Sequence, residues 1–472
     1  MKKCIIFGCG KNGRAAFEKL KLFYDIECWA DNDETKWGSW VKEVPVIEPE
    51  RIQEYAQNDE LDIFICMYDY QEAYKQLKAM GIQNVYVWKG GFFYKPEGLF
   101  PLEFPRLNYH KKTQKNEGLH VLFVSNAAAI RDNKIASVVK KAGVKVYLAF
   151  IEEDPRIASP EFVDMYEEIY PIMSIRELYD FVKNSEFDIV HCSSEPEYTA
   201  AVLKNTDKPI ILDCHDLRSS YQKMNHDKLT LEFLSHRGAT GVIYPTEGLR
   251  EETIRKYDIN REDTLVIENY PSSDLCVLEK KEKLSCIDGE LHAVYEGGII
   301  SNNNTECNKY FQDIWLKIVN AGVHVHFYSQ ADVKYCRYLE SLHPYLHYEG
   351  NMSSKELASE LTKYDVGLCV FNNNPKHQLY ADNSSPLKLC EYINSQIPVA
   401  VGNVNSHITF LRKYRCGDCL DLEKDIKRQL CTIANIKIPE NILEKNKLTI
   451  DSKIEQILEF YDRAIKKKRG AK

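Results

Sequence analysis

The sequence predicts an α/β protein made of three Rossmann-like, doubly wound units. Short apolar runs alternate with amphipathic stretches at helical spacing along most of the chain, which is typical of parallel sheets with helices on both faces. Two polar segments, 92–117 and 276–290, interrupt this alternation and read as linkers. A length of 472 residues is also too great for a single hydrophobic core.

Composition excludes several classes of protein. A hydrophobic content of 44% and a charged content of 28% are ordinary for a soluble globular protein. The net charge of −8 argues against a dedicated nucleic-acid binder, and no apolar run approaches the ~20 residues that span a bilayer. The start, MKKCIIFGCGKNG, has too short an apolar run for a signal peptide, so the fifteen cysteines are expected to be reduced thiols. We therefore expect a cytoplasmic protein.

The first unit, residues 1–91, opens with a short apolar strand that leads directly into Gly8, Gly10 and Gly13 and then into a helix. Asp31 follows the next strand. This pattern is the nucleotide-binding fingerprint, in which glycines allow a tight turn and close approach of phosphate, and the acid binds a ribose hydroxyl. The unit has no room for a substrate domain, so we expect no hydride transfer.

Two interpretations of this first unit remain open. It binds a nucleotide or nucleotide sugar, or it is a degenerate Rossmann domain that docks a partner. The segment Asp31–Asp33 also fits an Asp-x-Asp metal motif, but its place after the second strand favours ribose binding, so we predict no metal there.

The second unit spans residues 118–285, after the proline-containing linker 92–117. Ligands of such sheets bind beyond the carboxyl ends of the strands. His215 and Asp216 directly follow the strand PIILDC and are the strongest catalytic candidates. An imidazole there can donate or accept a proton at a bound ligand, and the alternative is a histidine bonded only to backbone.

The third unit, 286–435, contains the most informative stretch, Ala381–Gly402, which reads as loop, helix, turn and buried strand. Ser384 and Ser385 are N-cap types, and Pro386 suits a first helical position. The apolar face of this helix is predicted to contain Leu387, Cys390, Ile393 and Asn394.

The start of this helix is a predicted anion site, because free N–H groups and the helix dipole point outward beside a parallel sheet. Lys388 lies in the first turn and Glu391 three residues on, which suits a phosphate and a sugar hydroxyl. The plainer alternative is a surface Lys–Glu pair that contributes roughly 0.2–0.5 kcal/mol.

The pattern P-x-K-x-x-E-Y followed by I-P-V-A resembles the donor-site signature of retaining family-four glycosyltransferases of GT-B architecture, in which two Rossmann-like domains face each other. The resemblance covers roughly 118–440 and implies that Glu391 binds the donor ribose and the helix start binds the diphosphate. It also implies a glycine turn after the first strand of the donor domain. The implied donor-binding residues are Gly297, Gly298, Asn383, Ser385, Lys388 and Glu391.

Two departures from the family pattern stand out. Many members carry a glutamate where this chain has Asn383, and an Arg and a Lys where it has Ser301–Thr305. Amides and hydroxyls supply no charge, so Lys388 and the helix dipole would neutralise more of the diphosphate. The segment D-x-H-D ending in Asp216 resembles the part of the family's N-terminal domain that faces the cleft.

The resemblance implies a metal-independent hexosyltransferase that moves a sugar from a nucleotide-diphosphate donor to an acceptor hydroxyl, in cell-surface polysaccharide or glycolipid synthesis. No cofactor is expected for transfer, and any nucleotide cofactor would lie in the first unit. Residues 436–472 are expected to form crossover helices and a basic tail, which could contact an anionic membrane surface at its inner face or could simply be a solvated end. The alternatives are a nucleotide-sugar epimerase and a non-catalytic scaffold. His324 and His326 alternate on one strand, where we expect ordinary packing and no metal.

Overall fold

The computed structural model describes most of the chain, and its contacts divide the protein into two compact units. The first unit comprises 1–213, 231–241 and 461–472, and the second comprises 214–230 and 242–460. The described residues are 2–21, 23–56, 61–67, 69–89, 92–96, 118–125, 130–151, 165–172, 174–194, 198–220, 224–273, 280–300, 307, 309–372 and 381–470.

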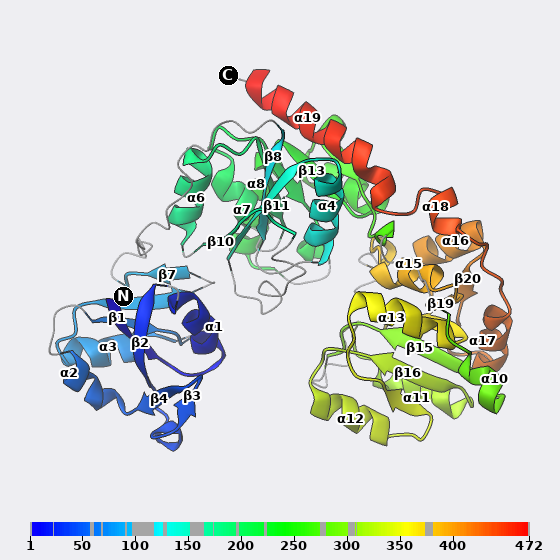
Figure 1. The fold of residues 1–472 in the computed structure, drawn as a ribbon, viewed down its shortest axis with the longest axis horizontal. Coiled ribbons are helices and arrows are strands. Elements are labelled where there is room, and N and C mark those ends of the chain that lie inside the picture. The colour runs from blue at the N-terminus through cyan, green and yellow to red at the C-terminus, as the bar shows by residue number, and fades with distance from the viewer. Residues whose placement is uncertain are drawn as a thin grey trace. The chain divides into compact units, whose positions relative to one another are not determined.

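Three sheets flanked by helices form the framework, as the sequence predicts (Figure 1). The first has the order β3-β4-β2-β1-β5-β6-β7 and is parallel except for the β3–β4 and β6–β7 pairs. Its elements are β1 (Lys2–Phe7), α1 (Lys11–Leu20), β2 (Tyr24–Ala30), β3 (Trp40–Val41), β4 (Val44–Ile47), α2 (Ile52–Tyr55), β5 (Asp62–Ile65), α3 (Gln71–Ala79), β6 (Val85–Lys89) and β7 (Phe92–Tyr94).

Strand β7 lies beyond the expected boundary at Gly91, because Phe92–Tyr94 pairs with β6 in antiparallel register. The aromatic start of the expected linker is therefore part of the first sheet. The remainder of that linker, 97–117, lies outside the described residues.

The second sheet has the order β10-β9-β8-β11-β12-β13-β14. Its strands are β8 (His120–Ser125), β9 (Lys145–Phe150), β10 (Ile169–Pro171), β11 (Ile189–Ser193), β12 (Ile210–Asp213), β13 (Gly241–Tyr244) and β14 (Thr264–Val266). The intervening helices are α4 (Ile130–Lys141), α6 (Ile175–Asn184), α7 (Thr199–Leu203), α8 (His226–Gly238) and α9 (Glu247–Tyr257).

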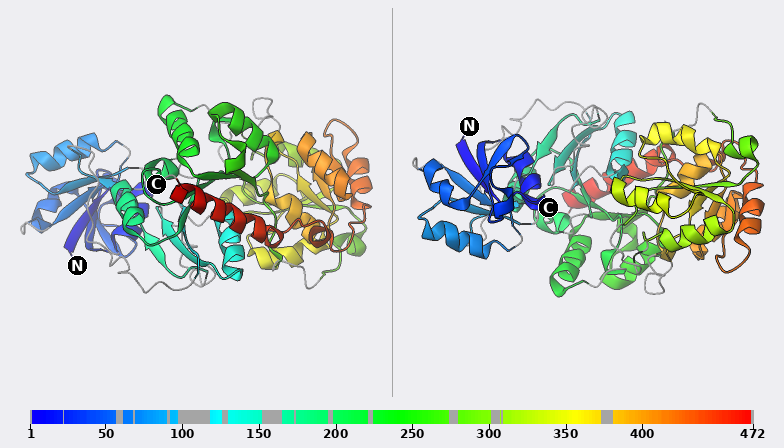
Figure 2. Two further views of the ribbon diagram at one scale, coloured as in Figure 1. Left: turned by 90° about the horizontal axis from the view of Figure 1, so that it is seen from above. Right: turned by 90° about the horizontal axis from the view of Figure 1, so that it is seen from below.

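The helix α19 (Ile454–Gly470) returns to this sheet (Figure 2). Buried Tyr461 bonds through its hydroxyl to Nδ1 of buried His191 on β11, at 2.7 Å. Beside them the Nε atom of Arg131 donates to both carboxylate oxygens of Asp213 at 3.0 and 2.8 Å. A residue far along the chain thus closes a buried polar network at the carboxyl ends of β11 and β12.

The third sheet has the order β17-β16-β15-β18-β19-β20 and is parallel throughout. Its strands are β15 (His292–Glu296), β16 (His324–Tyr328), β17 (Leu346–Tyr348), β18 (Val366–Cys369), β19 (Val399–Val401) and β20 (Gly417–Cys419). Its helices are α10 (Leu284–Asp288), α11 (Gln312–Asn320), α12 (Val333–Ser341), α13 (Ser354–Glu360), α15 (Leu387–Asn394), α16 (Asn405–Tyr414), α17 (Ile426–Ala434) and α18 (Ile442–Lys445).

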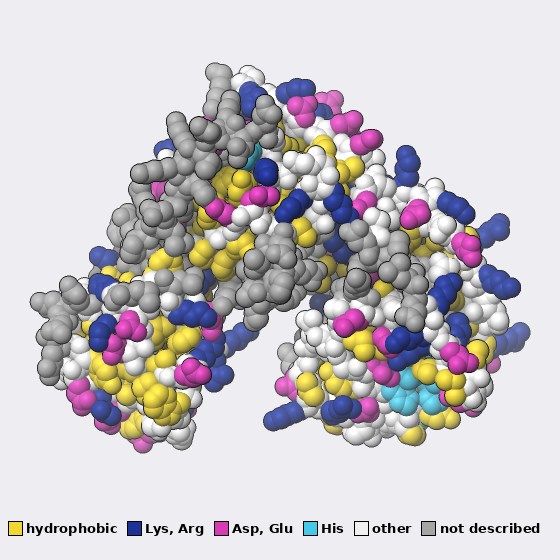
Figure 3. Space-filling model, viewed as in Figure 1, with side chains coloured by type: hydrophobic (Ala, Val, Ile, Leu, Met, Phe, Trp, Pro, Cys, Tyr) yellow, Lys and Arg dark blue, Asp and Glu magenta, His cyan; other side chains and the backbone are white. Residues whose placement is uncertain are grey.

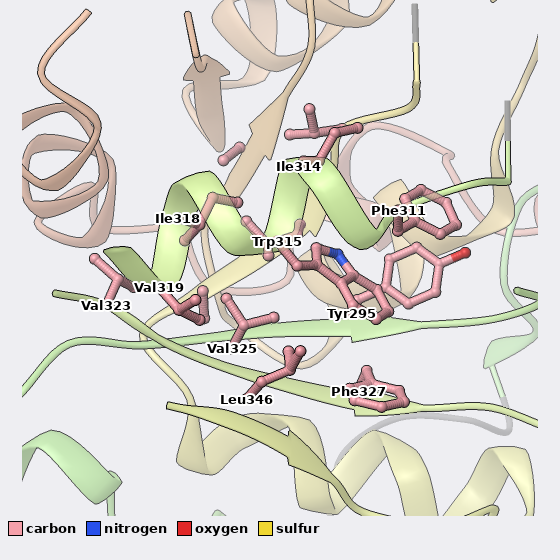
Figure 4. Packing of buried hydrophobic residues seen from close by; sticks show 14 of the residues in the cluster. Tyr295, Phe311, Ile314, Trp315, Ile318, Val319, Val323, Val325, Phe327 and Leu346 are labelled. Carbon is pink, nitrogen blue, oxygen red and sulfur yellow. The ribbon is translucent and has the colours of Figure 1, made fainter. Parts of the chain in front are cut away.

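One face of the third sheet forms an apolar core with α11 (Figure 4). Trp315 stacks on Phe311 with ring centroids 5.4 Å apart, and both contact the ring of Tyr295 at the end of β15. This packing fixes the strand end from which the predicted glycine turn departs.

Helix α15 forms where the sequence predicts, but two details differ. It begins at Leu387 with Pro386 as its N-cap residue, and no side chain bonds to the cap position, so the expected serine cap is wrong. The buried residues are Leu389, Cys390, Tyr392 and Ile393, whereas the predicted Leu387 and Asn394 are half-buried. Because Tyr392 is also buried, the inward-facing side of α15 differs from the one that the apolar spacing predicts.

Two further observations concern the described residues. None of their helices combines the length and the apolar character that a membrane crossing requires. Their cysteines are free thiols. The segment Ser301–Thr305, where the sequence departs from the family pattern, lies outside the described residues, as do 126–129 and 195–197.

Candidate functional site

A glycine turn at the carboxyl end of β15 forms the centre of the candidate site. Gly297 has φ of 128°, which favours glycine, and its N–H donates to the carbonyl of Tyr328 at 3.1 Å. The Tyr295 hydroxyl donates to the carbonyl of Gly298 at 2.9 Å. The turn is therefore fixed from within, while Gly298 itself is exposed.

Lys388, in the first turn of α15, extends to this turn. Its Nζ lies 3.1 Å from the position that a Cβ on Gly297 would occupy, so a side chain there would displace the ammonium group. The same Nζ lies 4.1 Å from the ring centroid of Tyr295 and 5.6 Å from that of Phe371. The structure thus brings Gly297, Gly298 and Lys388 together, as predicted.

The ammonium group of Lys388 remains charged at neutral pH. Burial by itself would lower the pKa of Lys388, but interactions with Tyr295, Glu296 and Cys369 outweigh burial and raise that pKa above its usual value. A positive charge is therefore held at the carboxyl edge of the third sheet.

The start of α15 adds a second favourable element for an anion. No described side chain caps the helix at Pro386, although the N–H of Leu389 donates to the carbonyl of Pro386 at 3.1 Å, and the helix dipole places partial positive charge at this end. Glu391 lies in the next turn and is half-buried, with its backbone carbonyl bonded to the N–H of Ser395 at 3.0 Å.

Tyr392 supports the site, and the sequence analysis gave it no role. It is fully buried, and its hydroxyl accepts from the N–H of Glu296 at 3.0 Å and donates to the carbonyl of Leu368 at 3.3 Å. Its ring packs so closely on β18 that a Cβ on Gly367 would lie 2.4 Å from ring carbons. In the sequence, the signal for this contact is a tyrosine directly after Glu391 together with Gly367 in β18.

Asn383 and Ser385, both predicted donor-binding residues, contact the segment that follows β13. The side-chain amide of Asn383 donates to Glu252 at 2.8 Å, and the backbone carbonyl of Asn383 accepts from the Thr246 hydroxyl at 2.8 Å. The Ser385 hydroxyl accepts from the N–H of Asn269 at 3.2 Å, and its carbonyl accepts from the Asn269 amide at 2.8 Å. These contacts anchor the loop that precedes Lys388.

Gly248 shows how tightly Asn383 is seated. A Cβ at Gly248 would lie 2.2 Å from Oδ1 of Asn383, so the close approach requires glycine at the start of α9. The position where the resemblance places a carboxylate is therefore occupied by an amide engaged with α9.

His215 and Asp216 directly follow β12 and Cys214, as predicted, and both are half-buried. They belong to the same compact unit as Gly297, Lys388 and Glu391.

In the first sheet, the three glycines of the predicted fingerprint differ in whether and why the structure requires glycine. Gly8 has φ of 101°. A Cβ on Gly13 would lie 1.9 Å from the carbonyl oxygen of Gly8, so α1 packs on the turn only without a side chain there. Gly10 is exposed and no atom lies within 4 Å of its would-be Cβ. Close packing of the chain therefore accounts for Gly8 and Gly13 but not for Gly10.

Asp31 lies beside this turn and is already bonded to the chain. Its carboxylate accepts from the N–H of Cys9 at 2.9 Å and of Asp33 at 3.0 Å, and Lys36 Nζ lies 3.2 Å away. Burial by itself would raise the pKa of Asp31, but these hydrogen bonds outweigh burial and hold the pKa below its usual value. A ribose hydroxyl would have to share this carboxylate with Lys36.

A cavity of about 800 Å³ opens near the carboxyl ends of β18, β19 and β20, to one side of the glycine turn. None of the predicted donor residues lines it, although Phe371 links it to Lys388. Its lining residues are Asp313, Ile314, Lys317, Val370, Phe371, Asn372, Gly402, Asn403, Ile408, Arg412, Asp418, Cys419, Leu420, Asp421, Leu422, Glu423, Lys424 and Gln429.

Two groups of described side chains are spaced as metal ligands are. One is Asp132, His191 and Asp213. Asp213 already binds the guanidinium of Arg131, which supplies positive charge to this group in place of a metal ion. The other is His292, His324 and His326, at the opposite ends of the strands from the glycine turn.

Comparisons with known proteins agree with this architecture. Residues 120–270 match the model of Glycosyltransferase Family 4, and residues 308–449 match that of the Glucosyltransferase 3-like C-terminal domain. No curated protein has a sequence that matches the chain.

Solved structures with the same fold include a glycosyltransferase from Rickettsia africae ESF-5, with 13% identity over 74% of this chain and 100% of that chain, at a TM-score of 0.52. Anabaena Alr3699/HepE, solved in complex with UDP and glucose, has 12% identity, covers 74% of this chain and 97% of its own, and has a TM-score of 0.48. The two family matches, one to each of the last two sheets, and the shared fold support a family-four-like glycosyltransferase of GT-B architecture.

Proposed function

We propose that the protein transfers a hexose from a nucleoside-diphosphate donor to an acceptor hydroxyl, with retention at the anomeric carbon and without a metal ion. The observation that carries this proposal is the convergence of Lys388, the Gly297 turn and the uncapped start of α15. A fixed cation and the positive end of a helix dipole complement a diphosphate, which carries negative charge on closely spaced oxygens.

Each residue then has a distinct role. Lys388 and the helix start stabilise the charge that develops on the departing diphosphate, which is the main catalytic contribution in such a site. Glu391 binds the ribose hydroxyls. His215 and Asp216 act on the acceptor side, in the same compact unit. The acceptor we propose is a growing cell-surface polysaccharide or a glycolipid.

The test is a thermal-shift panel of nucleotide sugars, followed by mass spectrometry of the products formed with candidate acceptors. His215→Ala should lower the transfer rate and leave the donor dissociation constant unchanged, because its interaction is made mainly in the transition state. His226→Ala is the control, since His226 is an exposed histidine on α8. A product that is an isomer of the donor, formed without acceptor, would instead identify an epimerase.

A non-catalytic nucleotide-sugar-binding protein is the second candidate, and Asn383 favours it. The resemblance places a carboxylate at this position, whereas here an amide donates to Glu252. Tight donor binding with no turnover on any acceptor would support this alternative over transfer.

For the first sheet we propose a nucleotide or nucleotide-sugar module without hydride transfer. The exposed Gly10, whose missing side chain no packing explains, supports close approach of a ligand. Calorimetry with nucleotide sugars on the wild type and on Gly10→Val tests this, because a β-branched side chain there would block the approach. Equal binding by both proteins would favour the docking alternative.

A further inference from the structure

Four histidines gather on one face of the third sheet, opposite the apolar core. Parallel register pairs His292 with His324 and His326 with His347, so all four side chains project from the same side of β15, β16 and β17. Figure 3 shows histidine side chains grouped together on this part of the molecule. His292 and His326 are buried, and His324 and His347 are half-buried.

The two buried histidines stand between two carboxylates. Nε2 of His292 lies 3.0 Å from Oδ2 of Asp288, and Nδ1 of His326 lies 2.6 Å from Oε1 of Glu349. The remaining ring nitrogens face each other, with Nδ1 of His292 2.9 Å from Nε2 of His326.

The four groups in this row, Asp288, His292, His326 and Glu349, cannot all form hydrogen bonds when both histidines are neutral. An ionised carboxylate only accepts hydrogen bonds, so each outer ring nitrogen must carry the proton. A neutral imidazole carries one proton, and the two inner nitrogens of His292 and His326 are then both lone pairs. Two lone pairs 2.9 Å apart repel unless a cation lies between them. The arrangement is therefore complete only with an added positive charge.

We propose that this histidine cluster binds a divalent transition-metal ion such as Zn²⁺, through Nδ1 of His292, Nε2 of His326 and a ring nitrogen of His324. Imidazole nitrogen is a preferred ligand of Zn²⁺, Ni²⁺ and Cu²⁺. The candidate ligand atoms of the three residues lie within 4.8 Å of one another.

The surroundings of the ligands match those of known metal sites. Metal-bound histidines usually donate their other N–H to a carboxylate, as His292 and His326 do to Asp288 and Glu349. His324 has its own partner, because its Nδ1 lies 2.9 Å from Nε2 of His347.

Binding requires small rearrangements. With Zn–N bonds of about 2.0–2.1 Å in a tetrahedral site, ligand nitrogens lie about 3.3 Å apart, so the inner pair opens by a few tenths of an ångström. The ring of His324 stacks on that of His292 at 4.6 Å and 21°, and it must rotate to point its lone pair at the ion. His324 also stacks on Tyr345 with ring centroids 3.9 Å apart, so the rotation exchanges part of this stacking for a bond to the ion.

The proposed ion would be structural and not catalytic. His292 is the first residue of β15, and Gly297 lies five residues on, about 16 Å along an extended strand. An ion here would cross-link β15 to β16 at the amino ends of the strands and stabilise the sheet that carries the glycine turn. The proposal is independent of the proposed transfer reaction.

The test uses the full chain without a polyhistidine tag, stripped of metal by a chelator and then titrated with Co²⁺ and Zn²⁺. We expect one Co²⁺ per chain, with the visible absorption bands of a site with nitrogen ligands, displacement by Zn²⁺, and a higher Tm with metal than without. His326→Gln and His324→Gln should each weaken metal binding at least tenfold, and His226→Gln on α8 should not.

The wild-type measurement keeps the test decisive even if a variant fails to fold. Absence of Co²⁺ binding to the wild type would overturn the proposal, as would full binding to both cluster variants. A Tm that follows pH but not added metal would also overturn it, because a shared proton would then supply the charge.

Discussion

Replacing Lys388 by methionine tests the centre of the candidate donor site. Methionine keeps the apolar stem on the rings of Tyr295 and Phe371, which lie 4.1 and 5.6 Å from the ammonium, and it removes only the charge. The raised pKa of Lys388 means that the wild type carries this charge throughout the neutral range. The variant should therefore fold normally and lose an ionic contact to the ligand.

The expected loss follows from the chemistry of that contact. A hydrogen bond to a charged group contributes about 1.5–3 kcal/mol, which corresponds to an approximately 10- to 150-fold weaker dissociation constant. The resemblance places an Arg and a Lys where this chain has Ser301–Thr305, and these uncharged residues cannot replace the charge of Lys388. The loss should thus lie toward the upper end of the range.

The assay is isothermal titration calorimetry with UDP, GDP and ADP at constant ionic strength, because salt screens charge interactions. Lys413→Met is the matched control: Lys413 also lies over an aromatic ring, that of Tyr414 at 4.9 Å, but it is exposed on α16. A nucleotide that binds the wild type and Lys388→Met equally well would refute the assignment of the diphosphate to the Gly297 turn.

Three further predictions concern stability and support of the site. Gly13→Ala should destabilise the first sheet by about 3 kcal/mol or more in urea unfolding, because backbone blocks the new Cβ, whereas Gly10→Ala should change it by less than about 1 kcal/mol; equal effects would contradict the packing argument. Burial lowers the pKa of His407 to about 4. The unfolded chain therefore takes up this proton near pH 6.5 while the folded protein does not, so stability should fall by ~3 kcal/mol as pH drops from 6.5 to 4, and His407→Gln should reduce the loss. The check is the urea midpoint of both proteins across this pH range, and parallel curves would reject the assignment. Tyr392→Phe should cost about 1–3 kcal/mol, because it leaves the N–H of Glu296 without its acceptor. It should also weaken nucleotide binding in calorimetry, and unchanged stability and affinity would show that the hydroxyl is dispensable.

The sequence predicted the three sheets because their signals are local. Each sheet begins with an apolar strand, and in the first and third the strand runs into glycines, a combination with few other structural meanings. Lys388 and the Gly297 turn were likewise predictable as a pair, since the carboxyl ends of parallel strands and the starts of the following helices meet at one sheet edge.

The remaining features depend on contacts that no local pattern encodes. The bonds from Asn383 to Glu252 and from Ser385 to Asn269 join residues 131 and 116 positions apart. The expected serine cap failed for this reason, because the Ser385 hydroxyl is engaged with Asn269.

The histidine cluster escaped the sequence analysis in the same way. His324 and His326 were visible as an alternating pair on one strand, but Asp288, His292 and Glu349 come from other elements. Their meeting depends on strand order and register.

The bond between Tyr461 and His191 bears on how the protein is made. These two residues are 270 positions apart, and both are buried in the first compact unit. Folding that depends on such distant contacts is slow, and domains generally fold as units during synthesis. A nascent chain that has just produced β11 exposes the place where Tyr461 will lie. The second sheet therefore reaches its final packing only after the ribosome has passed residue 461, and until then its unfinished apolar surface is a natural substrate for chaperones.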